Sequence, residues 1–153
     1  MGQRDIDPRC QLPAPETCRF CQSHVHYVNN KEIYGRSYGR WPYAYLCSNK
    51  ECGAFVGVHP NTQIPMGTLA DAATRAARKE AHSVFDQIWK TNLMKRGEAY
   101  KWLAKRLDIE KWRCHIAWFD TVTCKRVVKV CQPLLQSQNS HISNEEAYRM
   151  ITS

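Results

Sequence analysis

The chain of 153 residues is long enough for one ordinary domain, or for a small metal-bound module together with a helical one. No apolar run approaches the length needed to cross a bilayer, so the sequence excludes a transmembrane helix. The net charge of +8 at pH 7 favours phosphate-bearing or otherwise acidic partners.

The sequence at residues 1–8 contains no apolar stretch of the kind that a secretory signal needs, and we therefore expect a cytoplasmic protein. In a reducing compartment, the eight cysteines are expected to be metal ligands or buried thiols rather than disulfides. The positive charge is concentrated in residues 67–113, which contain eleven Lys and Arg against six Asp and Glu, whereas residues 1–30 are neutral. A basic surface is thus expected mainly on the middle of the chain.

Residues 1–17 are predicted to be an irregular lead-in, because Pro8, Pro13 and Pro15 interrupt any regular pattern. Cys10 lies within this segment. We interpret Cys10 as a free thiol, because irregular chain is a poor preorganised metal donor. The alternative is that Cys10 is an additional or replacement metal ligand.

Two pairs of cysteines follow the lead-in. Cys18 and Cys21 are separated by two residues, and Cys47 and Cys52 by four. Two close pairs of thiolates can complete a tetrahedron around one zinc ion, each pair held on one tight turn. We therefore predict a zinc ribbon with one structural Zn²⁺. The second spacing is wider than usual, and His24 is an alternative ligand.

The ribbon is predicted to contain short strands at residues 24–28, 43–46 and 54–59. The loop before the second strand interleaves aromatic and guanidinium side chains, and Trp41 ends the run. If this loop is extended, Tyr34, Arg36, Tyr38 and Arg40 share one face. Such a face offers stacking planes and phosphate contacts together, which single-stranded nucleic acid exploits. The alternative is that the tyrosines fill the small core of the ribbon.

A long helix is predicted after a capping box at residues 68–71, through an Ala-rich run that extends to about residue 90. Its apolar stripe is expected to contain Ala73, Ala77, Ala81, Val84 and Ile88. The opposite side is expected to carry Arg75, Lys79, His82 and Asp86. His82 and Asp86 are four residues apart, so the carboxylate can orient the imidazole or pair with its charged form.

A second helix is predicted over about residues 97–107. Its inward face is expected to contain Tyr100, Leu103, Ala104 and Leu107. Trp102 is expected on the other face, near Lys101, Lys105 and Arg106. This environment suits a base-stacking or interface anchor. The alternative is that the aliphatic stems of the basic side chains cover the indole.

Residues 111–120 are densely aromatic and match neither helical nor strand periodicity. Asp120 is predicted to cap a following helix through residue 130, which Pro133 ends. A capping box at residues 143–146 predicts a short closing helix through residue 150.

A second metal site is conceivable in the carboxyl-terminal half. Its ligands would be Cys114, His115, Cys124 and Cys131. Their spacing matches no tight knuckle, so we interpret them as buried thiols and a core histidine.

Several of these motifs together resemble those of one known family. They are the two cysteine pairs at 18–21 and 47–52, VGVHP at 56–60, PMGTLAD at 65–71, RAARKEAH at 75–82 with FD at 85–86, YKWL at 100–103 and CHI at 114–116. The chain resembles the zinc-finger-containing domain proteins of bacteriophages and prophages, a family of unknown function. The resemblance implies a small viral protein with one bound zinc ion, acting in the cytoplasm of a bacterial host. It implies no catalytic residues.

We predict an α+β fold, with a zinc ribbon of short antiparallel strands at residues 18–66 and a small helical domain at residues 67–153 that shares its core. The favoured function is a nucleic-acid-binding module with a structural zinc ion and a basic, aromatic surface. The predicted surface contains Tyr34, Arg36, Tyr38, Arg40, Trp41, Arg75, Arg78, Lys79, His82, Trp102, Lys105 and Arg106.

Two other functions are considered. The first is an inhibitor or adaptor of phage origin that binds a host protein, itself one that handles nucleic acid, with Trp41, Trp102, Trp112 and Trp118 as anchors. The second is a hydrolase or nuclease using His82, Asp86 and His115. A zinc ion held by four cysteines has no open position for water, and no pair of carboxylates is spaced for two metals, so the sequence favours binding over catalysis.

Overall fold

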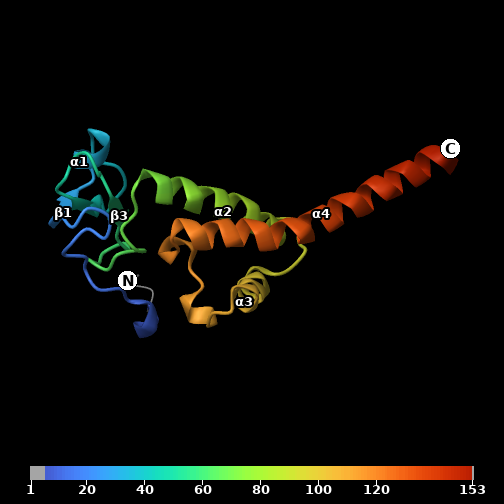
Figure 1. Ribbon diagram of the computed structural model, residues 1–153, viewed down its shortest axis with the longest axis horizontal. Coiled ribbons are helices and arrows are strands. Elements are labelled where there is room, and N and C mark those ends of the chain that lie inside the picture. Colours follow the sequence, from blue (N-terminus) through green and yellow to red (C-terminus); the bar gives the residue numbers. More distant parts are fainter. Residues whose placement is uncertain (1–5, 153) are drawn as a thin grey trace.

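The structure is a computed structural model that describes residues 6–152, with the side chains of residues 6–137 (Figure 1). The amino-terminal part contains the 3-10 turn η1 (Pro8–Cys10), strands β1 (Val25–Asn29), β2 (Tyr43–Cys47) and β3 (Phe55–Gly57), and the short helix α1 (Lys31–Tyr34). The remainder contains helices α2 (Ala72–Lys90), α3 (Arg96–Leu107) and α4 (Thr121–Thr152), with the 3-10 turns η2 (Lys111–Arg113) and η3 (Ile116–Trp118) before α4.

The three strands form an antiparallel sheet in the order β1-β2-β3. Val25 lies opposite Cys47, and Tyr45 lies opposite both Tyr27 and Val56. A sheet of this size, followed by helices, confirms the predicted ribbon and helical domain. No helix in the described part of the chain combines the length and apolar character that a bilayer crossing requires.

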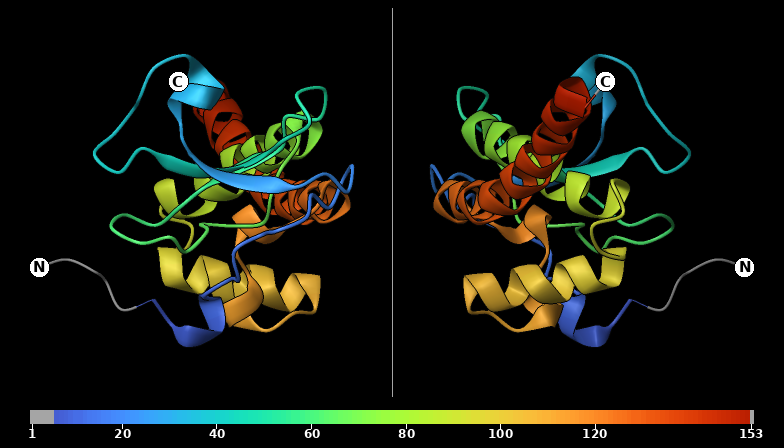
Figure 2. Two further views of the ribbon diagram at one scale, coloured as in Figure 1. Left: turned by 90° about the vertical axis from the view of Figure 1, so that its left-hand side faces the viewer. Right: turned by 90° about the vertical axis from the view of Figure 1, so that its right-hand side faces the viewer.

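Helix α2 packs along the first half of α4, and α3 lies beside this pair (Figure 1). Seen from the ribbon, the sheet lies across the end of the α2–α4 pair (Figure 2). The far half of α4 extends away from the body of the molecule (Figure 1).

The buried face of α2 differs from the predicted stripe. It contains Thr74, Arg78, Ala81, Phe85 and Ile88. Ala73 is exposed, and Ala77 and Val84 are half-buried. The reason is that alanine buries little apolar area, so the large side chains of Phe85 and Ile88 determine which face turns inward.

Helix α2 also begins one turn later than the capping box predicted. Asp71, and not Thr68, is the N-cap: its Oδ1 accepts hydrogen bonds from the Thr74 backbone N at 2.9 Å and from Thr74 Oγ1 at 2.6 Å. Asp120 accepts from the backbone N of Thr123 at 2.8 Å, which confirms it as the cap of α4.

The sequence predicted that Pro133 ends this helix. In the structure, Pro133 lies inside α4. A proline within a helix removes one backbone donor and is tolerated where the freed carbonyl can reach solvent. Pro133 is exposed, which fits that condition. The predicted closing helix at residues 143–150 is therefore the last part of α4.

The buried apolar side chains form two clusters rather than the single shared core expected from the sequence. The ribbon cluster surrounds Val25, Tyr45, Val56 and Leu69. The helical cluster includes residues of α2, α3, η3 and α4. Hydrogen bonds join the two parts at Thr68, whose backbone N donates to Ala117 O at 3.0 Å and whose backbone O accepts from Arg78 Nη1 at 2.9 Å.

Candidate metal centre and binding surface

The four cysteines of the two pairs meet at one end of the sheet. The sulfur atoms of Cys18, Cys21, Cys47 and Cys52 all lie within 4.8 Å of one another. Cys18 Sγ is 3.7 Å from Cys52 Sγ, and Cys21 Sγ is 3.4 Å from Cys47 Sγ. Four sulfurs bound to zinc at about 2.3 Å would stand about 3.8 Å apart, so the observed separations fit a tetrahedral site. The four cysteines can hold one zinc ion.

Each pair is held by a tight turn that ends in a left-handed residue. In the first turn, the backbone N of Gln22 donates to Cys18 O at 2.9 Å, and Gln22 has φ of 67°. In the second, the backbone N of Gly53 donates to Asn49 O at 3.0 Å, and Gly53 has φ of 62°. Glycine adopts that conformation without steric cost, which explains its place directly after Cys52.

The electrostatics of the four thiols are uneven. Hydrogen bonds from Ser23 lower the pKa of Cys21 to about 6. Burial raises the pKa of Cys47 to about 12. A divalent cation among the sulfurs would favour the thiolate form of all four, so zinc binding should release protons and weaken as the pH falls.

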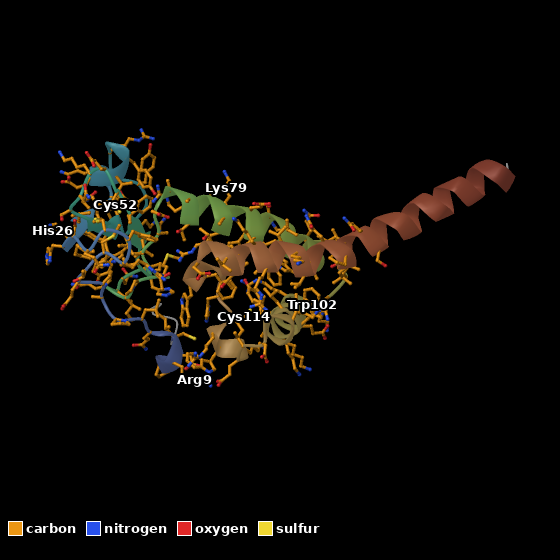
Figure 3. The ribbon with its side chains drawn as sticks, in the orientation of Figure 1. Arg9, His26, Cys52, Lys79, Trp102 and Cys114 are labelled. Carbon is orange, nitrogen blue, oxygen red and sulfur yellow. The ribbon has the colours of Figure 1, made fainter. Side chains whose placement is uncertain are left out.

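Neither alternative ligand belongs to this centre. His24 is exposed, and its ring contacts that of His26 with centroids 4.6 Å apart. The sulfur of Cys10 lies 3.3 Å from Nε2 of His115, near the helices. Figure 3 shows the separation between the ribbon at Cys52 and the helical part at Cys114.

No second group of metal ligands is found among the residues that the structure describes. Cys114, Cys124 and Cys131 are buried in the helical cluster. Burial raises the pKa of Cys114 to about 11 and that of Cys131 to about 12, as expected of inert core thiols. The interpretation of His115 as a core residue is wrong, because His115 is half-exposed beside Cys10.

The aromatic loop is folded rather than extended. Gly35 ends α1 with φ of 85°, and Gly39 turns the chain again with φ of 81°. Tyr34 and Tyr38 nevertheless stay together, with a ring-centroid distance of 5.6 Å in an edge-to-face arrangement. The guanidinium of Arg36 lies 4.6 Å from the centre of the Tyr38 ring.

Phe55 joins this group, although it is not among the residues predicted for the binding surface. Its ring lies 6.0 Å from that of Tyr34, and the guanidinium of Arg75 lies 4.2 Å above it. The available signal was strand alternation: Val56 points into the ribbon core, so Phe55 must face the other side. We call Tyr34, Arg36, Tyr38, Phe55 and Arg75 the aromatic–arginine patch.

The two tryptophans of the predicted surface are only half-exposed. Trp41 Nε1 donates a hydrogen bond to Thr62 O at 2.7 Å, and its ring contacts Tyr43. Trp102 packs against the helical cluster, and the guanidinium of Arg106 lies 6.0 Å from its ring. Trp41 has an evident structural role, and Trp102 fits the covered-indole alternative.

The basic residues of the predicted surface differ in burial. Those that are exposed are Arg36, Arg40, Lys79, Lys105 and Arg106, and Arg75 is half-buried. Arg78 is buried, with 9% of its surface accessible, and donates to the carbonyl oxygens of Phe119 and Thr68, so the assignment of Arg78 to a binding surface is wrong.

The predicted pair of His82 and Asp86 is present, with Nδ1 of the imidazole 3.6 Å from Oδ1 of the carboxylate. Asp86 also accepts a hydrogen bond from Trp89 Nε1 at 3.2 Å. His115 contacts Cys10 and Trp118 instead of this pair. The observed contacts therefore split the triad that was considered for a hydrolase.

A family model described as a zinc-finger-containing domain matches residues 14–134. No curated protein and no solved structure matches the chain.

Proposed function

The chain belongs to the zinc-finger-containing domain family, and from this premise we propose that its zinc-stabilised ribbon binds single-stranded nucleic acid through the aromatic–arginine patch. We further infer that it acts in the cytoplasm, that of a bacterial host if the chain is phage-encoded.

The exposure of the patch is the observation that carries the proposal. Tyr34 and Tyr38 have 53% and 46% of their surface accessible. Bases stack on such rings regardless of sequence, because every base has a π face. The guanidinium groups of Arg36 and Arg75 lie over neighbouring rings, a position from which they can contact phosphate oxygens.

Zinc supports this surface indirectly. The patch is assembled from α1, the following loop, β3 and the start of α2, and the ribbon cluster beneath it is small. A structural zinc ion supplies much of the folding free energy of such a sheet. It would thereby hold the loop and β3 in the arrangement that stacks Arg75 on Phe55.

Lys79 extends the charged surface along α2. Its side chain points away from α4, on the side of the molecule that also carries α1 (Figure 3). Arg40 lies in the loop next to the patch, and we assign both residues to phosphate contacts. Lys105 and Arg106 belong to α3, on the other side of the α2–α4 pair (Figure 1), and contribute only to the general positive potential.

The proposal is tested with labelled single-stranded DNA and RNA oligonucleotides, followed by fluorescence anisotropy across a salt series. Y38A should lose about 1–3 kcal/mol of binding free energy through the lost stacking plane. R36Q should reduce the slope of log K against log salt by about 0.7, the value for one phosphate contact on a single strand.

The matched control is R126Q, which removes the same charge from an exposed position on α4. It should leave both affinity and slope close to those of the wild type. Absence of binding at low salt, or equal effects of R36Q and R126Q, contradicts the proposal. If the protein then captures a host protein through the patch, and this capture survives nuclease treatment, the result supports the alternative partner, a host protein that handles nucleic acid.

A further inference from the structure

Cys10 differs from the other seven cysteines, all of which lie in the part of the chain that the structure describes. Four form the metal centre, and Cys114, Cys124 and Cys131 are buried in the helical cluster. Cys10 is half-exposed. With zinc bound, it is therefore the one thiol of the chain that solutes can reach.

The thiol of Cys10 lies against an imidazole. Its sulfur is 3.3 Å from Nε2 of His115 and 3.5 Å from the carbonyl oxygen of Trp112. The imidazole is held by the ring of Trp118, which stacks on it with centroids 4.3 Å apart and an interplanar angle of 28°. When Nδ1 carries the ring hydrogen, Nε2 can accept the proton of the thiol, which is the arrangement of a nucleophile and its base.

Both residues line a pocket of about 740 Å³, formed by η1, the start of α3 and η2. A volume of this size accommodates a small organic molecule. Tyr100 and Trp112 supply aromatic wall. Figure 3 shows Arg9 and Cys114, both of which line this pocket, well away from the metal centre at Cys52.

The charges around the pocket favour an anion. Its cationic residues are Arg9, Arg96 and Lys111, and its acidic residues are Asp7 and Glu110. Asp7 is paired with Arg9 at 2.9 Å, and Glu110 accepts a hydrogen bond from the Trp112 indole. The guanidinium of Arg96 lies over the Tyr100 ring at 4.9 Å, and Lys111 is exposed. Arg9 offsets Asp7, so Arg96 and Lys111 exceed the carboxylate of Glu110 by one positive charge, which an anionic ligand can complement.

We propose that Cys10 and His115 form a reactive thiol site for low-molecular-weight disulfides that carry carboxylates. The Cys10 thiol gives its proton to Nε2 of His115, and the thiolate attacks one sulfur of the disulfide. The S–S bond breaks, its electron pair leaves on the departing sulfur, and that thiolate takes the proton from His115. Cys10 is oxidised to a mixed disulfide, and the released half is reduced to a thiol.

The base is required because the thiol does not ionise readily. Burial raises the pKa of Cys10, with the charge of Asp7 acting in the same direction and that of Arg9 against it. The other titratable or charged groups near the pair are Asp7, Arg9, His59, Arg96, Glu110 and Lys111. None of these is expected to replace His115, because no hydrogen bond joins any of them to the Cys10 thiol in the described structure.

The test uses the zinc-loaded full chain and two probes, glutathione disulfide, which carries carboxylates, and cystamine, a disulfide that carries amines. Intact mass spectrometry and peptide mapping follow the reaction. A single addition at Cys10 is expected. The ratio of the reaction rate with glutathione disulfide to the rate with cystamine should be higher for the protein than for free cysteine.

Three variants separate the parts of the site. H115N should react about a hundredfold more slowly. R96Q and K111Q should each reduce the preference for glutathione disulfide by about threefold, while R126Q, distant on α4, leaves it unchanged. Zinc content and circular dichroism check that each variant is folded.

Two results overturn the proposal. One is equal reactivity of wild type and H115N, which removes the base. The other is a wild type whose preference for glutathione disulfide over cystamine is no greater than that of free cysteine, or that is modified at other cysteines first. This comparison needs no variant and holds even if H115N is unfolded.

Discussion

Of the residues whose side chains the structure describes, Arg78 is the charged one that is buried. Its Nε donates to Phe119 O at 2.9 Å, and its Nη1 donates to Thr68 O at 2.9 Å. Its Nη2 donates to Thr68 Oγ1 at 2.5 Å. Burial lowers the pKa of the guanidinium, but arginine titrates so far above neutrality that the charge remains. Arg78 thereby ties α2 to the segment from the ribbon and to the residue before the cap of α4.

Replacing this side chain should cost stability and not binding. R78M leaves three acceptors without their donor, and we expect a loss of about 3 kcal/mol in the free energy of unfolding. R78K should recover little of it, because an ammonium lacks the planar fork that reaches the three acceptors. Urea unfolding of the zinc-loaded protein measures both.

The control is K79M, at the exposed neighbouring position, for which we expect a change within about 0.5 kcal/mol. An R78M protein with wild-type stability but reduced affinity for oligonucleotides would return Arg78 to the binding surface.

The difference between these neighbours was not evident in the sequence. Helical periodicity groups residues by face, but Ala73 and Ala77 offer too little apolar area to show which face of α2 turns inward. Phe55 was overlooked for a related reason: its role depends on Arg75, twenty positions later, which reaches it because β3 pairs with the segment before α2 at Ala70. The four zinc ligands, by contrast, were predictable because their spacing is local.

At the scale of single elements, the cap of α2 makes a pH-dependent contribution. Hydrogen bonds from Thr74 lower the pKa of Asp71 below its usual value of 3.8. The cap therefore contributes its full stability above pH 3.8, and this contribution is lost as the pH falls through the lowered folded-state pKa. D71A should lose about 1 kcal/mol at neutral pH.

D71N separates the cap from its charge. Asparagine is also a good N-cap, so this variant should be nearly as stable as wild type at pH 7. Below pH 3.8, D71N should become more stable than wild type, because only in the wild type is the capping side chain a carboxylate that becomes protonated. Thermal unfolding of both proteins at each pH is compared, since zinc release at low pH affects the two alike. A constant difference across the range would show that Asp71 does not titrate with folding.

Element types were predicted better than element ends. Hydrophobic period and flanking signals identified the strands, α2 and α3, because these depend on neighbours in sequence. The late start of α2 has a tertiary cause: Thr68, the predicted cap, bonds instead to Ala117 and to Arg78. The persistence of α4 through Pro133 likewise depends on which side of the helix faces solvent.

At the scale of the whole molecule, Gly67 decides how closely the ribbon and the helices can approach. A Cβ at this position would lie 2.1 Å from Ala117 O, and the next residue, Thr68, donates its backbone N to the same oxygen at 3.0 Å. G67A must push the two parts of the chain apart, and we expect a loss of at least about 2 kcal/mol in the free energy of unfolding.

G97A is the matched control for that experiment. Gly97 lies in the first turn of α3, and a Cβ there meets no atom within 4 Å. This substitution should stabilise the protein by about 0.5–1 kcal/mol, since alanine restricts the unfolded chain and favours helix. Equal effects of the two substitutions on chemical denaturation would show that the junction at Gly67 is not close-packed.

The separation into two clusters predicts how the molecule responds to loss of its metal. The helical cluster is large and contains no zinc ligand, whereas the ribbon cluster is small and includes Cys18 and Cys47. Chelation should therefore disorder the ribbon, seen as loss of its tyrosine and tryptophan signal in near-ultraviolet circular dichroism, while most helical signal persists. Oligonucleotide binding should disappear with the ribbon, because the patch depends on β3 and the loop before β2.

C47S should purify without stoichiometric zinc, and C10S should retain one equivalent, because Cys10 lies outside the centre. Elemental analysis of both variants distinguishes these outcomes, and a full equivalent of zinc in C47S would contradict a site built from these four sulfurs.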